Sequence, residues 1–172
     1  MVAAPSIPEY LMVCETRIGS DGQHLWRFSL ETLSGESVAD AADHEPCDLN
    51  RLALLAVVRG LESLDGPSGV TLMCNNRHVI HGLRNGLPTW RDNGFRWDYF
   101  GRLVAIPNQD LWVRVDRALD IHQVNTCWFS ASVALPRSAR PGGNLSSPAP
   151  LDRVRKWLAN QVSNESHNLS FA

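Results

Sequence analysis

The first third of the chain has a pattern of apolar and polar positions that predicts three consecutive β-strands. Residues 10–16 form a short apolar run typical of a buried strand, and residues 24–31 alternate as in a strand with one buried face. Residues 37–42 are the third candidate. Turn-forming residues separate the three segments, at 19–22 and 34–36. The pattern therefore predicts an antiparallel meander.

The middle of the chain changes to a helical pattern. Asp48 is a candidate N-cap for a helix over residues 49–64, whose apolar side chains cover most of its circumference, as in a helix buried on several sides. Residues 70–74 form a short, continuous apolar run of the kind found in parallel pairing. A second helix is expected over residues 77–85, ended by Gly86.

The remaining elements complete a mixed pattern. Asn108 is a candidate N-cap for a helix to about residue 122, residues 124–131 are the expected fifth strand, and residues 151–162 have an amphipathic helical pattern. This order predicts an α/β fold: a five-stranded mixed sheet, with three antiparallel and then two parallel strands, and helices on both faces.

The length of 172 residues suits one domain. We expect an N-terminal tail over residues 1–9, a domain over 10–162 with a flexible loop at 137–150, and a disordered tail over 163–172. The chain has no apolar run long enough for a transmembrane helix, and its start lacks the basic region of a secretory signal. A cytoplasmic location without a membrane partner is therefore expected.

Charge and cysteine usage add to this picture. The net charge of −2 conceals a split, because residues 1–65 hold 11 acidic and 4 basic side chains while residues 66–172 hold 7 and 12. Of the 16 basic residues 15 are arginines, which suit phosphate contacts, although solvated arginines from compositional bias are the ordinary explanation. The four cysteines form no CxxC pair, and we expect Cys14 and Cys74 to be free thiols packed in the core.

Several segments resemble motifs of the type 1 ribonuclease H family, in the family's own order. The most specific are Trp-x-x-x-Gly-aromatic at 90–95 and Asn-x-Asp-Leu-Trp at 108–112. Further matches are Asn-Arg-x-x-Leu at 50–54 on the central helix, the strand and turn at 71–79, and the last strand with its following helix. The resemblance spans roughly residues 10–162 and implies a ribonuclease H-like fold.

The resemblance also implies a two-metal nuclease site, from which this chain departs at most positions. In the family, acidic residues hold two divalent ions that clamp the scissile phosphate and activate water. The first-strand aspartate falls on Glu15, the helix glutamate on Ala53 and the fourth-strand aspartate on Asn75. Asp152 is a weak match for the fourth carboxylate, and residues 130–135 lack the family's histidine. Glu15 and Asp152 are thus the only candidate metal ligands among these positions. We expect Mg²⁺ or Mn²⁺ as a cofactor only if the protein is an active nuclease.

The arginines and aromatic residues of 77–102 form the clearest candidate binding surface, because the family's helical handle contacts the backbone of the hybrid. The candidate nucleic-acid-binding residues are Asn50, Arg51, Arg77, Arg84, Trp90, Arg91, Phe95, Arg96 and Trp97. Trp90 and Trp97 are equally candidates for the core. Asn50 and Arg51 are equally suited to bonds at the start of the helix and to a surface ion pair.

Three functions stay open at this point. The first is a ribonuclease H-like domain that binds an RNA–DNA hybrid or other nucleic acid and is catalytically degenerate. The second is an active ribonuclease H, with Glu15, Asn75 and Asp152 as remnant ligands; Asp43 or Glu45 would favour it by entering the site. The third is a protein-interaction module that keeps only the fold. The sequence leaves the oligomeric state open.

Overall fold

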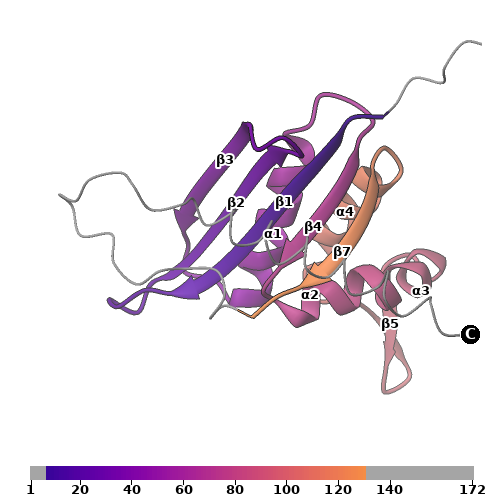
Figure 1. Cartoon of the computed structure of the whole chain (residues 1–172). Helices are drawn as coiled ribbons and strands as arrows, with labels where there is room; N and C mark the ends of the chain where they lie inside the picture. The colour runs from indigo at the N-terminus through magenta and orange to yellow at the C-terminus, as the bar shows by residue number, and fades with distance from the viewer. Residues whose placement is uncertain (1–6, 131–172) are drawn as a thin grey trace, which may run out of the picture. The chain divides into compact units, whose positions relative to one another are not determined.

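A computed structural model describes residues 7–130 of the chain (Figure 1). Five of its strands form one sheet in the order β3-β2-β1-β4-β7. They are β1 (Glu9–Ile18), β2 (His24–Thr32), β3 (Ser37–His44), β4 (Gly69–Cys74) and β7 (Gln123–Trp128). The pairs β1–β2 and β2–β3 are antiparallel, whereas β1–β4 and β4–β7 are parallel. The predicted mixed sheet is therefore confirmed.

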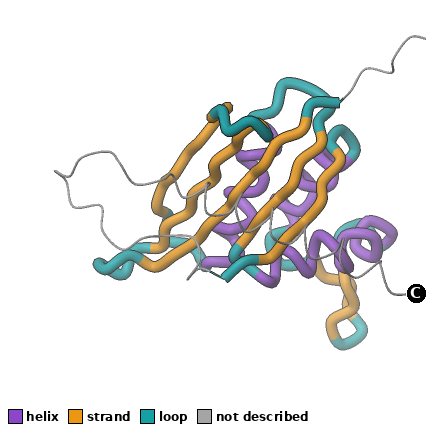
Figure 2. Tube along the Cα trace, in the orientation of Figure 1, coloured by secondary structure: helices purple, strands orange, loops and turns teal. Residues whose placement is uncertain are grey.

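Two longer helices lie together behind this sheet (Figure 2): α1 (Leu49–Glu62) and α4 (Gln109–Leu119). Asp48 caps α1 as predicted, because its carboxylate accepts hydrogen bonds from the backbone N–H groups of Asn50 and Arg51. The helix is buried on several sides, and Gly60 lets it approach Met12 of β1 closely. The helix expected over 151–162 on the other face, the loop at 137–150, the tail at 163–172 and Asp152 all lie outside the described residues.

The core between α1 and the sheet contains both predicted buried thiols. Cys14 and Cys74 are fully buried, and all four cysteines are free. Burial raises the pKa of the Cys14 thiol and raises that of Cys74 to about 11, so both stay protonated at neutral pH. Over residues 7–130, no helix combines the length and apolar character needed to cross a membrane.

The helical segment after β4 does not end at Gly86, contrary to the prediction. It runs through α2 (Arg77–His81), a π-helical turn η1 (Gly82–Gly86) and α3 (Leu87–Asp92). Pro88 lies in the first turn of α3, a position that the fixed φ of proline suits. Gly82 and Gly86 instead provide close contact, because a β-carbon at these positions would overlap the rings of Trp112 and Trp90.

Asn108 does not cap α4 with its side chain, which is a second correction. Its backbone is left-handed, with φ of 57°, a conformation that asparagine tolerates better than most residues. Its side-chain oxygen accepts a hydrogen bond from Arg51 Nη1 at 3.1 Å instead. The helix also ends at Leu119, before His122, which is buried.

A small second sheet, consisting of β5 (Arg96–Tyr99) and β6 (Arg102–Ala105), was not predicted. The two strands form a hairpin that projects away from the five-stranded sheet near α3 (Figure 1). Every residue of both strands is exposed. Only β5 alternates between charged and aromatic residues, and each strand is just four residues long, so the pattern was too short to predict the hairpin.

Candidate functional site

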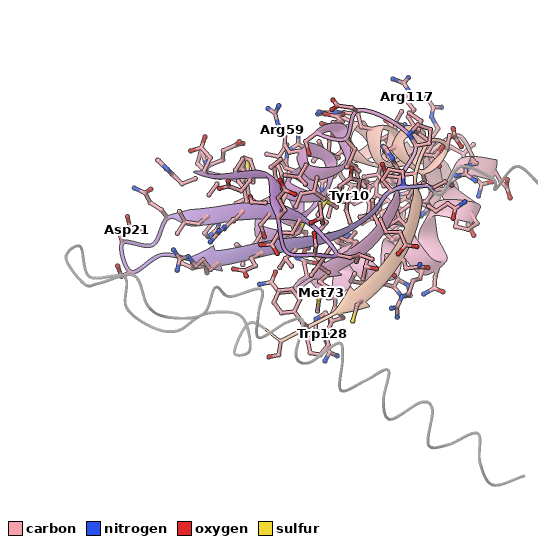
Figure 3. All side chains as sticks on the ribbon, turned by 45° about the horizontal axis from the view of Figure 1, so that its top comes forward. Tyr10, Asp21, Arg59, Met73, Arg117 and Trp128 are labelled. Atoms are coloured by element: carbon pink, nitrogen blue, oxygen red, sulfur yellow. The ribbon has the colours of Figure 1, made fainter. Side chains whose placement is uncertain are left out.

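The carboxyl ends of β1 and β4 bring two of the predicted site residues together. Cys14 and Cys74 are partners in the parallel register, so Glu15 and Asn75 lie next to each other where the pairing ends. The backbone N–H of Asn75 donates to the carbonyl of Cys14 at 3.4 Å. In Figure 3, Met73 and Trp128 mark the neighbouring ends of β4 and β7.

Both polar atoms of the Asn75 amide are occupied by the backbone of β1. Its Oδ1 accepts from the N–H of Thr16 at 3.0 Å, and its Nδ2 donates to the carbonyl of Thr16 at 2.9 Å. The amide thus extends the ladder between β1 and β4 by one further pair of hydrogen bonds. A carboxylate could supply the acceptor but not the donor.

Glu15 is the carboxylate that the site retains within the described residues. It lies opposite Arg27 in the β1–β2 register, and Arg17 follows two positions along the same strand. Burial raises the pKa of Glu15, and the two arginines oppose that shift without cancelling it. A half-buried carboxyl with a raised pKa ionises less readily than an exposed one.

The other predicted ligand positions add no carboxylate. Ala53 lies in the core on α1, with 1% of its surface exposed. Asp43 lies near the end of β3 and Glu45 directly follows it, and β3 is separated from β1 by the whole of β2, a distance of about 10 Å. Metal–oxygen bonds are about 2 Å long, so neither side chain belongs to the site beside Glu15.

These residues do not fit the two-metal site that the resemblance implies. Hard divalent ions require several oxygen ligands, preferably charged ones. Here residues 15, 53 and 75 provide one carboxylate, a methyl group and an amide whose atoms are already hydrogen-bonded. Within the described part of the chain, no three His, Cys, Asp or Glu side chains gather closely enough to hold a metal ion.

One positively charged side chain, that of Arg77, lies beside this site. Arg77 begins α2, and its guanidinium lies over the ring of Trp128 at 4.1 Å from the ring centroid. Because Trp128 is the register partner of Cys74, this pair lies at the same end of the sheet as Asn75. Arg77 is exposed, and the stacked ring holds its guanidinium beside the site.

Asn50 and Arg51 lie at the junction between α1 and its neighbours. Asn50 accepts a hydrogen bond from Nδ2 of Asn76 at 2.9 Å, and Asn76 caps α2. Arg51 forms two hydrogen bonds to the Asp110 carboxylate, at 3.0 and 2.8 Å. This bond lowers the pKa of Asp110 and raises that of Arg51. The surface ion pair considered for Arg51 is therefore present, and its nucleic-acid contact stays a prediction.

The predicted arginines of the helical segment divide into engaged and unengaged side chains. Arg84 donates from Nε to Thr126 Oγ1 at 2.8 Å, and Arg91 donates to Asp116 from Nε at 2.9 Å and also from Nη2. Arg96, in contrast, has no ion-pair partner within residues 7–130. Thus Arg77 and Arg96 offer the more available positive charge.

The predicted aromatic residues divide in the same way. Trp90 is half-buried and packs edge-to-face against Trp112, with ring centroids 4.9 Å apart. Phe95 also packs against the core, whereas Trp97 is exposed. The sequence analysis missed Tyr99 and Phe100, although the alternation from Arg96 to Tyr99 followed by Gly101 could have indicated a hairpin.

Comparisons with known proteins were made with the sequence and with the fold, and no family model matches the chain. The chain is 36% identical over 83 residues to a ribonuclease H from Rhodospirillum rubrum, a match covering 48% of each protein. It is 30% identical over 128 residues to a ribonuclease H from Ruegeria pomeroyi, which covers 71% of this chain and 79% of the relative. The chain thus spans about half of the first relative and most of the second.

Solved structures with a similar fold include LC9-RNase H1, a type 1 RNase H with the type 2 active-site motif. Its TM-score is 0.62 at 19% identity, covering 77% of this chain and 67% of that one. LC11-RNase H1, solved in complex with an RNA/DNA hybrid, has a TM-score of 0.50 at 10% identity, covering 72% and 86%. At these identities the likeness establishes the fold alone.

Proposed function

We propose, given that this chain belongs to the ribonuclease H family, that it binds RNA–DNA hybrids and has lost, or nearly lost, the family's two-metal hydrolysis. The domain would span residues 10–162, of which 131–162 lie outside the described residues. A cytoplasmic location is part of the proposal, supported by four cysteines that are all free.

The observation that carries this proposal is the double hydrogen bond between the Asn75 amide and Thr16. A metal ligand must direct an oxygen lone pair at the ion, but Asn75 offers only a neutral amide oxygen, one of whose two lone pairs already accepts from the backbone N–H of Thr16. Ala53 provides no oxygen, and Glu15 is the single carboxylate among the described positions of the site. Even with Asp152, which lies outside the described residues, two carboxylates carry too little negative charge to hold two divalent ions well.

The guanidinium of Arg77 supplies the positive charge for the proposed nucleic-acid binding at this site. The guanidinium of Arg77, stacked on Trp128, is available to a phosphate oxygen without any metal ion. Arg96 extends positive charge along the same part of the chain. A related fold has been solved with a hybrid bound, which supports hybrids as the first ligand to test. The proposal therefore expects binding that does not depend on divalent ions.

The deciding experiment compares hydrolysis and binding of one RNA–DNA hybrid with the full-length chain. We expect no cleavage with Mg²⁺ or Mn²⁺, and the same dissociation constant with either ion or with EDTA. Substitution Arg77→Gln should weaken binding about tenfold, as expected for a lost charge-assisted hydrogen bond. Arg59→Gln is the matched control, because Arg59 is an exposed arginine in the last turn of α1 and belongs to none of the candidate surfaces (Figure 3).

Two results would overturn the proposal. Metal-dependent cleavage that Glu15→Gln abolishes would identify an active ribonuclease H. Absence of hybrid binding by the folded wild-type chain would remove the binding function and leave the protein-interaction module as the remaining alternative.

A further inference from the structure

Exposed apolar side chains are concentrated on the β5–β6 hairpin. Five of the ten large apolar side chains that are exposed in residues 7–130 lie between Trp97 and Val104. Phe100 is 91% exposed, Leu103 69% and Tyr99 59%. Scattered apolar residues are normal on a protein surface, but a cluster of this density marks a site of interaction.

The strand register sorts these side chains onto two faces. Trp97 pairs with Val104, and Tyr99 pairs with Arg102, so these four side chains share one face of the hairpin. We call it the aromatic face. Trp97 and Tyr99 are two positions apart on one strand, about 7 Å. The opposite face carries the remaining residues of the two strands: Arg96, Asp98, Leu103 and Ala105.

The turn places a further ring at the tip. Phe100 and Gly101 both have left-handed backbones, with φ of 50° and 78°, as a two-residue type I′ turn requires. The carboxylate of Asp98 fixes the turn by accepting from the N–H of Gly101 at 2.7 Å. The ring of Phe100 contacts that of Tyr99 edge-to-face, with centroids 4.8 Å apart. A bulky residue is costly at this turn position, so its presence indicates that the side chain is used.

The charges of the hairpin indicate the chemistry of its partner. Arg96 and Arg102 have no carboxylate partner in the described part of the chain, and the single acid of the hairpin, Asp98, is occupied by the turn. Exposed rings combined with unpaired guanidinium groups match a ligand that has both aromatic rings and negative charge. Unpaired nucleotides have both, and each of their bases can be stacked on, whereas the internal bases of a duplex are stacked on each other and a hydrocarbon surface has no charge.

We propose that the aromatic face stacks on unpaired nucleotides, with Arg102 contacting their phosphates. The inference rests on the proposed function, because the hairpin directly follows the helical segment that begins with Arg77 (Figure 1). The ligand of the whole protein is then a hybrid with an adjoining single strand rather than a blunt duplex.

The test uses the full-length chain and three probes: a blunt RNA–DNA hybrid, the same hybrid with a single-stranded overhang, and the same overhang made abasic. Stacking of one base changes affinity about tenfold. We expect the overhang to tighten binding by about that factor and the abasic overhang to give a much smaller gain, because it has phosphates but no rings.

Variants then assign the gain to the aromatic face. Tyr99→Ser should remove the gain from the overhang, whereas Tyr99→Phe should keep it because the ring remains. Leu103→Ser is the matched control, since Leu103 is an exposed apolar residue of the same hairpin on the opposite face. Equal melting temperatures of the variants would exclude a folding defect as the cause.

The outcomes separate the two proposals. If the blunt hybrid binds but the overhang adds nothing, the stacking inference is wrong and the proposed function stands. If the folded chain binds none of the probes, both are wrong. Loss of binding to phosphatidylserine vesicles, or of self-association, in Tyr99→Ser with oligonucleotide binding unchanged would assign the hairpin to a membrane or to a second copy instead.

Discussion

Asn75 uses its side chain to bridge two strands of the sheet at the end of their pairing. Its position was predictable, because a strand followed by the Cys-Asn-Asn turn matches the family's pattern. Its two bonds to Thr16 were not, since the partners are 59 residues apart and meet only through the register of β1 and β4. The same holds for the pairing of Arg51 with Asp110, also 59 residues away. Local patterns place residues on elements, but contacts between elements depend on packing.

Replacing Asn75 by aspartate tests whether the amide is structural. Asn75→Asp should lower the free energy of unfolding at pH 7 by about 1–3 kcal/mol, because the carbonyl of Thr16 loses its donor and faces a carboxylate. The loss should shrink at a pH low enough to protonate the new acid, which can then donate. Urea denaturation at both pH values measures the difference.

Asn50→Asp provides the control for that substitution. Asn50 only accepts its hydrogen bond from Asn76, so an aspartate keeps it, and the negative charge lies favourably in the first turn of α1. A stability loss as large as that of Asn75→Asp would show that charge near the site, and not the missing donor, is responsible.

At the scale of elements, the strands and the main helices followed from periodicity, and the exceptions have physical causes. The sequence predicted a helix end at Gly86. In the structure, Gly82 and Gly86 instead allow the helical segment to pack closely against aromatic rings. The contact of Gly82 with Trp112 joins segments that are distant in the sequence, whereas that of Gly86 with Trp90 lies within one continuous helical segment. The β5–β6 hairpin was missed because its strands have four residues each and only β5 alternates between charged and aromatic residues.

Gly82→Ala gives a test in which two effects have opposite signs. In a helix with free space, alanine is more stable than glycine by about 1 kcal/mol. Here the new methyl group would overlap Trp112, so we expect a net loss of about 1–3 kcal/mol and a lower melting temperature by circular dichroism. Gly66→Ala is the control, because no atom lies within 4 Å of its β-carbon position. A stabilised Gly82→Ala protein would contradict the packing described.

At the scale of the whole molecule, the positive charge in the later part of the sequence is only partly available for binding. The basic part includes the segment from Arg77 to Arg102, but two of its five arginines are hydrogen-bonded within the protein. The net charge of a segment therefore overstates the number of arginine side chains that are available to bind a polyanion. The sequence could predict the strand order and the basic segment, but not which guanidinium groups remain available.

The salt dependence of hybrid binding can count those groups. Each phosphate neutralised contributes about −0.9 to the slope of log affinity against log salt. Contacts from Arg77, Arg96 and Arg102 alone give a slope of about −3, whereas participation of Arg84 and Arg91 brings it to about −5. A titration series in KCl distinguishes the two, and a slope near zero would exclude phosphate contacts altogether.

The bond between Asn75 and the first strand also has a consequence for descent. A return to a carboxylate at residue 75 breaks a hydrogen bond to Thr16, and a return to glutamate at residue 53 puts a charge where 1% of the surface is exposed. Each step alone lowers stability before a complete ligand set exists to offset it. Under the proposed loss of hydrolysis, restoring the ligand set would pass through less stable single variants, so the loss would be easier to keep than to reverse.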